Sequence, residues 1–519
     1  MAENLTLALG MVASWNLILV VLASGVYGIF IGSIPGLTAT LAAALLVPFA
    51  FFLDPLPAIA SIITMSVMAI FAGDIPSALV RMPGTPASAA YVEDAYRLTQ
   101  SGRGALALGL GLLASSSGGI IGGLVLIFAA PQLAKVALNF TSYEYFWVAV
   151  LGLTAAVIIS RGSQVKGTIA LCIGLMVSTV GLDISVGFPR FTFGNTDLMG
   201  GIHFIPAMIG LFGLSQVLRN VIKPPEASAP IRIETTGMLR KSARTLWRYK
   251  KTALGGNAIG SAIGTLPGAG GDIAAWVSYA VTKNWSKDGR HFGRGKGHIQ
   301  PIVGASSANN AGVGSAYIPT LVFGIPGDTI TAILLGVLLI KGVQPGPALF
   351  ESQAPMLYAI FIVFIAANIL MIPLGYLAIR SSGLLLRVPG SVLMPMIVAF
   401  CVVGSFSINN GQLEIIIMLC FGILGYLLER ARFPLAPVVL GLVLGPIVEK
   451  NFMQSVIKTQ WDLTQFLTRP VSATLMIITI IVLVYPLIQG AVTTARARRR
   501  PPAAEREFTE PQPSEHHTR

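Results

Sequence analysis

Small polar residues follow four Pro-Gly dipeptides that lie in otherwise apolar sequence. A Pro-Gly pair interrupts a helix, and the helix that starts after it has unpaired N–H groups and a partial positive charge. Such an end suits a carboxylate or a phosphate, and nearby hydroxyls add donors. For any single hydroxyl, a hydrogen bond back to its own helix is an equally good interpretation. The predicted anion-binding residues are Pro35, Gly36, Thr38, Thr40, Gly84, Thr85, Ser88, Pro267, Gly268, Ala269, Gly270, Asn309, Asn310, Gly327, Asp328 and Thr329.

A second set of polar side chains offers oxygen ligands for a cation. Polar residues inside apolar segments are costly and often functional. The candidates for Na⁺ are Asp74, Asp272, Asn309, Asn310 and Thr329. Each has an alternative: the two asparagines could cap an irregular helix, and Asp272 could lie near a membrane edge. Arg81 could attract an anion. The safer interpretation is that its side chain extends so that the charged end reaches the membrane–water interface.

Motifs of other chemistries are absent from the sequence. It contains no GxxxxGK[ST] loop for ATP, no HExxH zinc motif and no GxSxG nucleophile. Residues 109–114 (GLGLLA) imitate a dinucleotide fingerprint but have no preceding strand. The three cysteines lie in apolar runs without CxxC spacing. We therefore expect no enzyme activity and no cofactor, apart from Na⁺ or H⁺ as a coupling ion.

The composition shows which elements must position these residues. Of the 519 residues, 54% are hydrophobic and only 11% are charged, against about 25% charged in soluble domains. A mean hydropathy of +0.75 predicts an integral membrane protein. Because a spanning helix needs about 20 apolar residues, we expect an all-α polytopic fold with about 10–14 membrane elements. The apolar segments lie near residues 14–34, 37–53, 56–80, 105–130, 143–160, 165–182, 201–221, 253–282, 302–325, 328–345, 355–379, 389–405, 412–428, 433–448 and 471–490.

Basic loops predict the orientation and the division of the chain. The net charge is +13, but the basic residues gather in loops without interleaved aromatics, so no nucleic-acid partner is expected. Nine Lys/Arg lie within residues 219–251, which predicts a cytoplasmic loop. The Arg-rich tail is also predicted to be cytoplasmic. We expect a membrane repeat at 1–218, a basic linker at 219–252, a second repeat with additional helices at 253–494 and a disordered tail at 495–519.

Residues 253–282 lie between this loop and a second basic loop that starts at Lys283. If both loops face the cytoplasm, the segment enters the membrane and returns on the same side. The sequence LPGAGG at residues 266–271 breaks it in the middle. We therefore predict a re-entrant hairpin whose broken backbone lies in the protein interior.

The two halves repeat this pattern. Residues 28–36 and 260–268 both read GxxxG[ST][IL]PG, with an offset of 232 residues. A second pair of breaks follows in the same order, at Pro83-Gly84 and Pro326-Gly327. A lone GxxxG usually means only close helix packing. Matched interruptions in two halves are typical of a transporter site, so we predict two inverted repeats with broken re-entrant helices.

At these residues the sequence resembles the large membrane subunit of the tripartite tricarboxylate transporters (TctA type). The resemblance covers roughly residues 20–350 and continues in length and hydropathy to about 490. It is carried by residues 32–41 (GSIPGLTATL), 82–91 (MPGTPASAAY) with Glu93 to Tyr96, 265–280 (TLPGAGGDIAAWVSYA), 308–320 (ANNAGVGSAYIPT), 324–337 (GIPGDTITAILLGV) and 342–351 (GVQPGPALFE).

The resemblance implies a secondary transporter of the bacterial cell inner membrane. It implies a small four-helix membrane subunit and a periplasmic substrate-binding protein as partners. The substrates would be di- or tricarboxylates or other organic acid anions, taken up with a cation, commonly Na⁺. An elevator motion is an analogy with other hairpin transporters. The chain could also form a homo-oligomer. The alternative functions to transport are a channel and a non-transporting assembly subunit.

Overall fold

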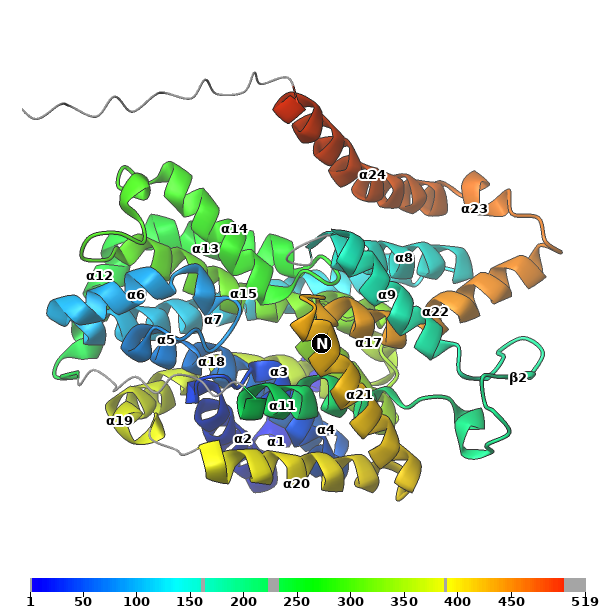
Figure 1. Ribbon diagram of the computed structural model, residues 1–519, viewed down its shortest axis with the longest axis horizontal. Helices are drawn as coiled ribbons and strands as arrows, with labels where there is room; N and C mark the ends of the chain where they lie inside the picture. The colour runs from blue at the N-terminus through cyan, green and yellow to red at the C-terminus, as the bar shows by residue number, and fades with distance from the viewer. Residues whose placement is uncertain (1, 160–163, 223–232, 387–389, 499–519) are drawn as a thin grey trace, which may run out of the picture.

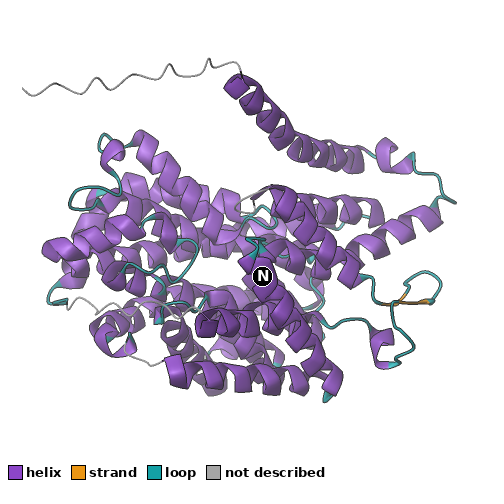
Figure 2. Ribbon diagram, viewed as in Figure 1, coloured by secondary structure: helices purple, strands orange, loops and turns teal. Residues whose placement is uncertain are grey.

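The computed structural model describes residues 2–159, 164–222, 233–386 and 390–498. Helices make up nearly all of the described chain, and Figure 2 shows one small hairpin apart from them. In that hairpin, β1 (Gly181–Leu182) pairs antiparallel with β2 (Pro189–Arg190). The all-α prediction is confirmed.

The helices follow the predicted apolar segments closely. Those before the basic linker are α1 (Ala2–Val12), α2 (Trp15–Ser33), α3 (Ala39–Phe51), α4 (Pro55–Ala72), α5 (Asp74–Val80), η1 (Ser88–Ala90), α6 (Val92–Leu98), η2 (Thr99–Arg103), α7 (Gly104–Ala137), α8 (Ser142–Ile159), α9 (Gln164–Ser178), η3 (Asp197–Gly200), α10 (Phe204–Met208), η4 (Ile209–Leu214) and α11 (Ser215–Ile222). Those after it are α12 (Met238–Arg248), α13 (Lys250–Gly264), α14 (Gly270–Trp285), η5 (Gly289–His291), α15 (Ile299–Phe323), α16 (Thr329–Ile340), α17 (Leu349–Ser352), α18 (Ala354–Arg380), α19 (Ser382–Leu385), α20 (Gly390–Asn409), α21 (Gln412–Arg430), α22 (Leu435–Lys458), α23 (Gln465–Thr468) and α24 (Pro470–Arg498).

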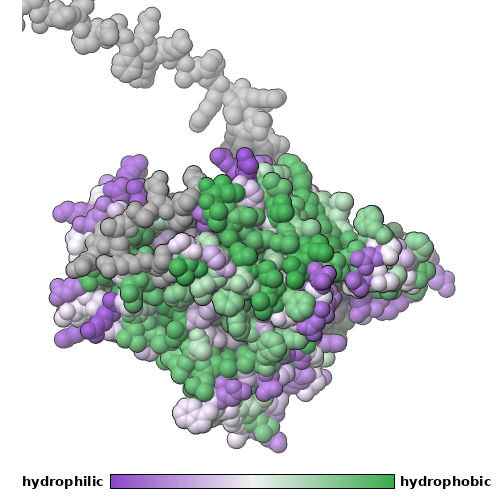
Figure 3. Space-filling view, turned by 60° about the horizontal axis from the view of Figure 1, so that its bottom comes forward, coloured by the Kyte–Doolittle hydropathy of each residue, from purple (hydrophilic) through white to green (hydrophobic). Residues whose placement is uncertain are grey.

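Twelve of these helical stretches are apolar enough to lie in a membrane. Eight are long enough to cross it, and four more are shorter apolar helices. Their sum (8 + 4) lies within the predicted range of 10–14 elements. Figure 3 agrees with this arrangement: apolar residues dominate the middle of the face shown, and hydrophilic residues gather toward its edges. The chain is a multi-pass membrane protein.

Two helices, α4 and α15, form the centre of the molecule. Nearly every residue of both is buried, and Ser66 of α4 hydrogen-bonds to Tyr317 of α15 at 3.3 Å. Helix α2 packs on α4, while α7, α13 and α14 pack on α15. This core positions the segments that follow the helix breaks.

Glycines in GxxxG spacing allow these helices to approach closely. A Cβ added at Gly28 or Gly32 of α2 would lie 2.4 Å from a backbone oxygen of α4. A Cβ at Gly260 or Gly264 of α13 would lie 2.3 Å from a backbone oxygen of α15. The packing interpretation of both GxxxG motifs is confirmed.

The predicted hairpin at residues 253–282 consists of two helices. Helix α13 ends at Gly264, α14 begins at Gly270, and the two pack together. The turn between them contains Gly268 with a φ of +79°, a backbone conformation that side chains disfavour. The prediction of a break at LPGAGG is therefore confirmed. Helices α4 and α5 are separated by Gly73 alone, whose φ of −61° is helical, so residues 55–80 form one nearly continuous helical stretch.

The linker and the tail differ in detail from their predicted extents. The linker contains helix α12, while its residues 223–232 lie outside the described chain. Helix α24 continues to Arg498, so the first four residues of the predicted tail (495–498) are helical. Residues 499–519 lie outside the described chain. The inversion of the two halves stays a prediction.

Candidate functional site

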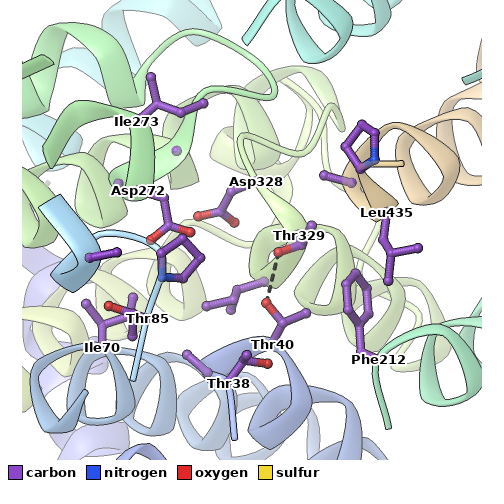
Figure 4. A pocket seen from close by; sticks show the side chains of 18 of the residues that line it. Thr38, Thr40, Ile70, Thr85, Phe212, Asp272, Ile273, Asp328, Thr329 and Leu435 are labelled. Carbon is purple, nitrogen blue, oxygen red and sulfur yellow. Dashed lines mark hydrogen bonds between the residues drawn. The ribbon is translucent and has the colours of Figure 1, made fainter. Parts of the chain in front are cut away.

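The four Pro-Gly segments meet around one cavity of about 740 Å³ (Figure 4). Two wall segments come from the first half and two from the second, although they are far apart in sequence. Among the predicted residues, those that line the cavity are Gly36, Thr38, Thr40, Gly84, Thr85, Gly268, Ala269, Gly270, Asp272, Asn309, Asp328 and Thr329.

Three helices begin in the wall of this cavity. Helix α3 starts after Thr38, α14 starts at Gly270, and α16 starts after Asp328. The first N–H groups of a helix have no partner within it and carry a partial positive charge. Three N-termini that converge on one cavity make its wall favourable for an anion.

Hydrogen bonds cross between the two halves at and beside the cavity. The hydroxyls of Thr40 and Thr329 lie 3.0 Å apart, as Figure 4 shows. The backbone N–H of Ala87 donates to Asp272 Oδ1 at 3.0 Å. Trp276 of α14 also donates to the carbonyl of Pro86 at 2.9 Å. The first break of each half thus contacts the second break of the other half.

Other polar residues of the site bond within their own segment. Thr38 Oγ1 accepts from Leu41 N–H at 3.1 Å and so caps α3. Asp328 accepts from Thr331 N–H at 2.7 Å and caps α16. Thr85 and Ser88 each accept from the other's backbone N–H at 3.1 Å. These hydrogen bonds stabilise the backbone at the helix breaks. That these residues also contact the substrate stays a prediction.

Carboxylates and an amide also face the cavity. Figure 4 shows the side chains of Asp272 and Asp328 directed into it. A Cβ added at Gly270 would lie 2.6 Å from Asp328 Cβ, so α14 and the start of α16 approach closely here. Asn309 Oδ1 is buried without a hydrogen-bond partner in the described chain. This donor set suits a hard cation with oxygen ligands.

Some predicted residues lie outside the cavity wall, namely Pro35, Asp74, Ser88, Pro267, Asn310 and Gly327. Asp74 is buried and accepts a hydrogen bond from Tyr91 at 2.5 Å. Asn310 is buried on α15, and neither of its side-chain polar atoms has a partner in the described chain. Gly327 packs against Ala316, where a Cβ would lie 2.7 Å from the backbone oxygen. Arg81 pairs with Glu93 at 2.6 Å rather than facing the cavity.

Sequence reasoning missed the part of the wall that later helices provide. Phe212, Gln216 and Arg219 come from the η4–α11 region, Glu429 comes from the end of α21, and Arg432 comes from the turn that follows it. Arg219 donates to Gln216, which in turn donates to the carbonyl of Gly36. Arg219 also pairs with Glu429 at 3.5 Å. These residues form no Pro-Gly motif, and the basic character of residues 219–251 was assigned to topology alone.

A model of the tripartite tricarboxylate transporter TctA family matches residues 18–440. The chain belongs to this family. Its members are the large membrane subunits of tripartite transporters, which work with a binding protein and a small membrane subunit. The TctA chain described here is therefore a transporter subunit, which agrees with the prediction of a non-enzymatic membrane protein.

Two relatives of this TctA chain come from Agrobacterium vitis. The "Uncharacterized 52.8 kDa protein in TAR-I ttuC' 3'region" is 33% identical over 461 residues, which cover 89% of this chain and 91% of the relative. The "Uncharacterized protein in TAR-II ttuC' 3'region" is 37% identical over 217 residues, 42% of this chain and 89% of the relative. No solved structure gives a significant match.

Proposed function

We propose that this TctA chain imports small organic acid anions, in particular di- or tricarboxylates, through the cavity at the helix breaks. The meeting of three helix N-termini in one cavity supports this most directly. A carboxylate there accepts hydrogen bonds from backbone N–H groups at the helix N-termini. A second carboxylate of the same molecule reaches toward Arg219 and Arg432.

The import is driven by a cation gradient, with Na⁺ as the coupling ion. Asp272, Asn309 and Thr329 provide oxygen ligands on the cavity wall, and the Asp328 carboxylate lies beside them. The charged lining residues are Asp272, Asp328 and Glu429 against Arg219 and Arg432, a formal balance of −1 (two positive minus three negative). Because the wall holds both signs of charge, an anion and a cation bind together more favourably than either alone.

Alternating access arises from two inverted repeats. The reciprocal contacts support this: Thr40 meets Thr329, and Asp272 meets Ala87. A pseudo-twofold relation produces such an exchange of contacts. The hairpins then slide as an elevator against the remaining helices and open the cavity to each side in turn.

The chain works in a bacterial inner membrane with its tail in the cytoplasm. Its partners are a periplasmic binding protein that delivers the anion and a small four-helix membrane subunit. The basic residues of the 219–251 linker support this orientation.

Uptake in proteoliposomes that contain all partner subunits tests the proposal. We expect accumulation of at least one acid from a panel of di- and tricarboxylates under an inward Na⁺ gradient. A proton gradient of equal size serves as the comparison, and a sodium ionophore should abolish accumulation. Equilibration without accumulation would instead identify a channel, and absence of any flux with the intact complex would exclude transport.

A further inference from the structure

Helix α12 in the linker has one strongly basic face. At roughly 100° per residue, Arg240, Lys241, Arg244 and Arg248 fall within about 100° of one another around the helix. All four are exposed, as are Lys250 and Lys251 directly after them. The four side chains form a basic stripe along α12, and we call them, together with Lys250 and Lys251 at the start of α13, the basic face.

The opposite side of α12 is fixed to the helical body. Met238 and Ser242 are buried against α7. A Cβ at Gly109 of α7 would lie 2.3 Å from Ser242 Oγ, so this glycine permits the close approach. Leu246 and Tyr249 pack in a small apolar cluster with Leu110. The basic face therefore points away from the body and cannot turn inward.

Neither α12 nor α13 contains an acidic residue. Between residues 235 and 271 the sequence has no Asp or Glu. Within the described chain, none of the six basic side chains forms an ion pair. Lys250 instead lies over the ring of Trp247, 4.7 Å from its centre. Six cations without counter-charges call for an anionic partner.

Large apolar side chains border the basic face. Trp247 is 73% exposed and Leu254 is 58% exposed. Trp285 is the last residue of α14, so it lies at the base of the α13–α14 hairpin, as Lys250 does, and it is 81% exposed. Tryptophan is enriched at the boundary between lipid and water. The basic face thus lies where an apolar, Trp-marked surface ends, and Figure 1 shows α12 at the left end of the molecule, opposite the end with β2.

We propose that the basic face of α12 binds anionic phospholipid head groups of the adjacent leaflet. Cations beside exposed tryptophan and leucine match a lipid, which has a phosphate next to an acyl chain. A nucleic acid or an acidic protein would have no use for the apolar border. Bound lipid fixes the base of the α13–α14 hairpin, whose tip places Gly268 and Asp272 in the cavity.

Thermal unfolding of the purified full chain in mixed micelles tests this site without any assumption about transport. Phosphatidylglycerol should raise the unfolding temperature more than phosphatidylcholine at the same concentration. The double variant Arg244→Gln/Arg248→Gln should weaken the apparent affinity for phosphatidylglycerol by about 25-fold, because each basic residue near a lipid surface contributes roughly fivefold. High salt should reduce the difference between the lipids, since about 1 M salt shortens the Debye length to about 3 Å.

Matched variants separate the lipid effect from a folding effect. Lys135→Gln/Lys450→Gln removes two exposed charges elsewhere and should retain the phosphatidylglycerol effect. Arg244→Lys/Arg248→Lys keeps the charge and should retain it too. Inorganic phosphate at the same concentration should not stabilise the chain. Equal stabilisation by both lipids, or full phosphatidylglycerol stabilisation of the Gln variant, would overturn the proposal.

Discussion

At the scale of single residues, the contact between Thr40 and Thr329 joins the two halves inside the cavity. Thr40→Val and Thr329→Val keep the side-chain shape but remove one hydroxyl. We expect each variant to lower the free energy of unfolding by about 1 kcal/mol, because the remaining hydroxyl loses its partner. The double variant should cost less than the sum of the two, which thermal unfolding of all four proteins measures. Strictly additive losses would mean that the hydroxyls do not interact.

Arg219 is the residue whose replacement should change the KM in a way that depends most on the charge of the substrate. It lines the cavity, but its side chain is 46% exposed and pairs with Glu429. We expect Arg219→Gln to raise the KM for a dicarboxylate about threefold to fivefold, as for a partly exposed ion pair. The increase should shrink at high salt, because charges at a rim act over distance. Uptake rates against substrate concentration measure it.

A neighbouring arginine provides the control for that prediction. Arg430 is exposed and borders a smaller adjoining cavity, without lining the main one. Arg430→Gln should leave the KM unchanged. If both variants raised the KM equally, a general loss of positive charge would explain the result. Arg219 would then have no specific role in substrate binding.

At the scale of elements, close packing of α13 on α15 holds the hairpin that carries Asp272. A Cβ at Gly260 would lie 2.3 Å from the backbone oxygen of Ala308. We therefore expect Gly260→Leu to destabilise the chain by about 3 kcal/mol and to abolish uptake, because backbone atoms cannot yield easily. Gly255 on the same helix has nothing within 4 Å of an added Cβ, so Gly255→Leu should melt like the parent. Equal melting temperatures for both variants would contradict this packing.

The same elements show what could be predicted from the sequence. Apolar length and Pro-Gly pairs are local signals, so the helices and the breaks at Gly36 and Gly268 were predictable. The wall formed by Gln216, Arg219 and Glu429 was not, because η4, α11 and α21 carry no break and reach the cavity only through packing. Asp74 was predicted as a cation ligand because it is a polar residue in apolar sequence, and only the structure shows that it is buried and does not line the cavity.

At the scale of the whole molecule, we expect the two ends of the long axis to lie on opposite sides of the membrane. The hairpin with β1 and β2 lies at one end of the long axis, and α12 lies at the other (Figure 1). The basic residues around α12 predict that its end is cytoplasmic. The last turn of α14, with Lys283, and the loop that follows it, with Lys287, belong to the same basic end.

Single cysteines test this orientation in a chain whose Cys172, Cys401 and Cys420 are replaced by alanine. Phe193 is 91% exposed beside the β hairpin, and Lys287 is exposed in the basic loop. In intact cells, a membrane-impermeant maleimide should label Phe193→Cys and should label Lys287→Cys only after the membrane is opened. Uptake by both single-cysteine variants would show that these chains are folded. Labelling of Lys287→Cys in intact cells would reverse the orientation, and with it the direction in which the two sets of helix breaks face.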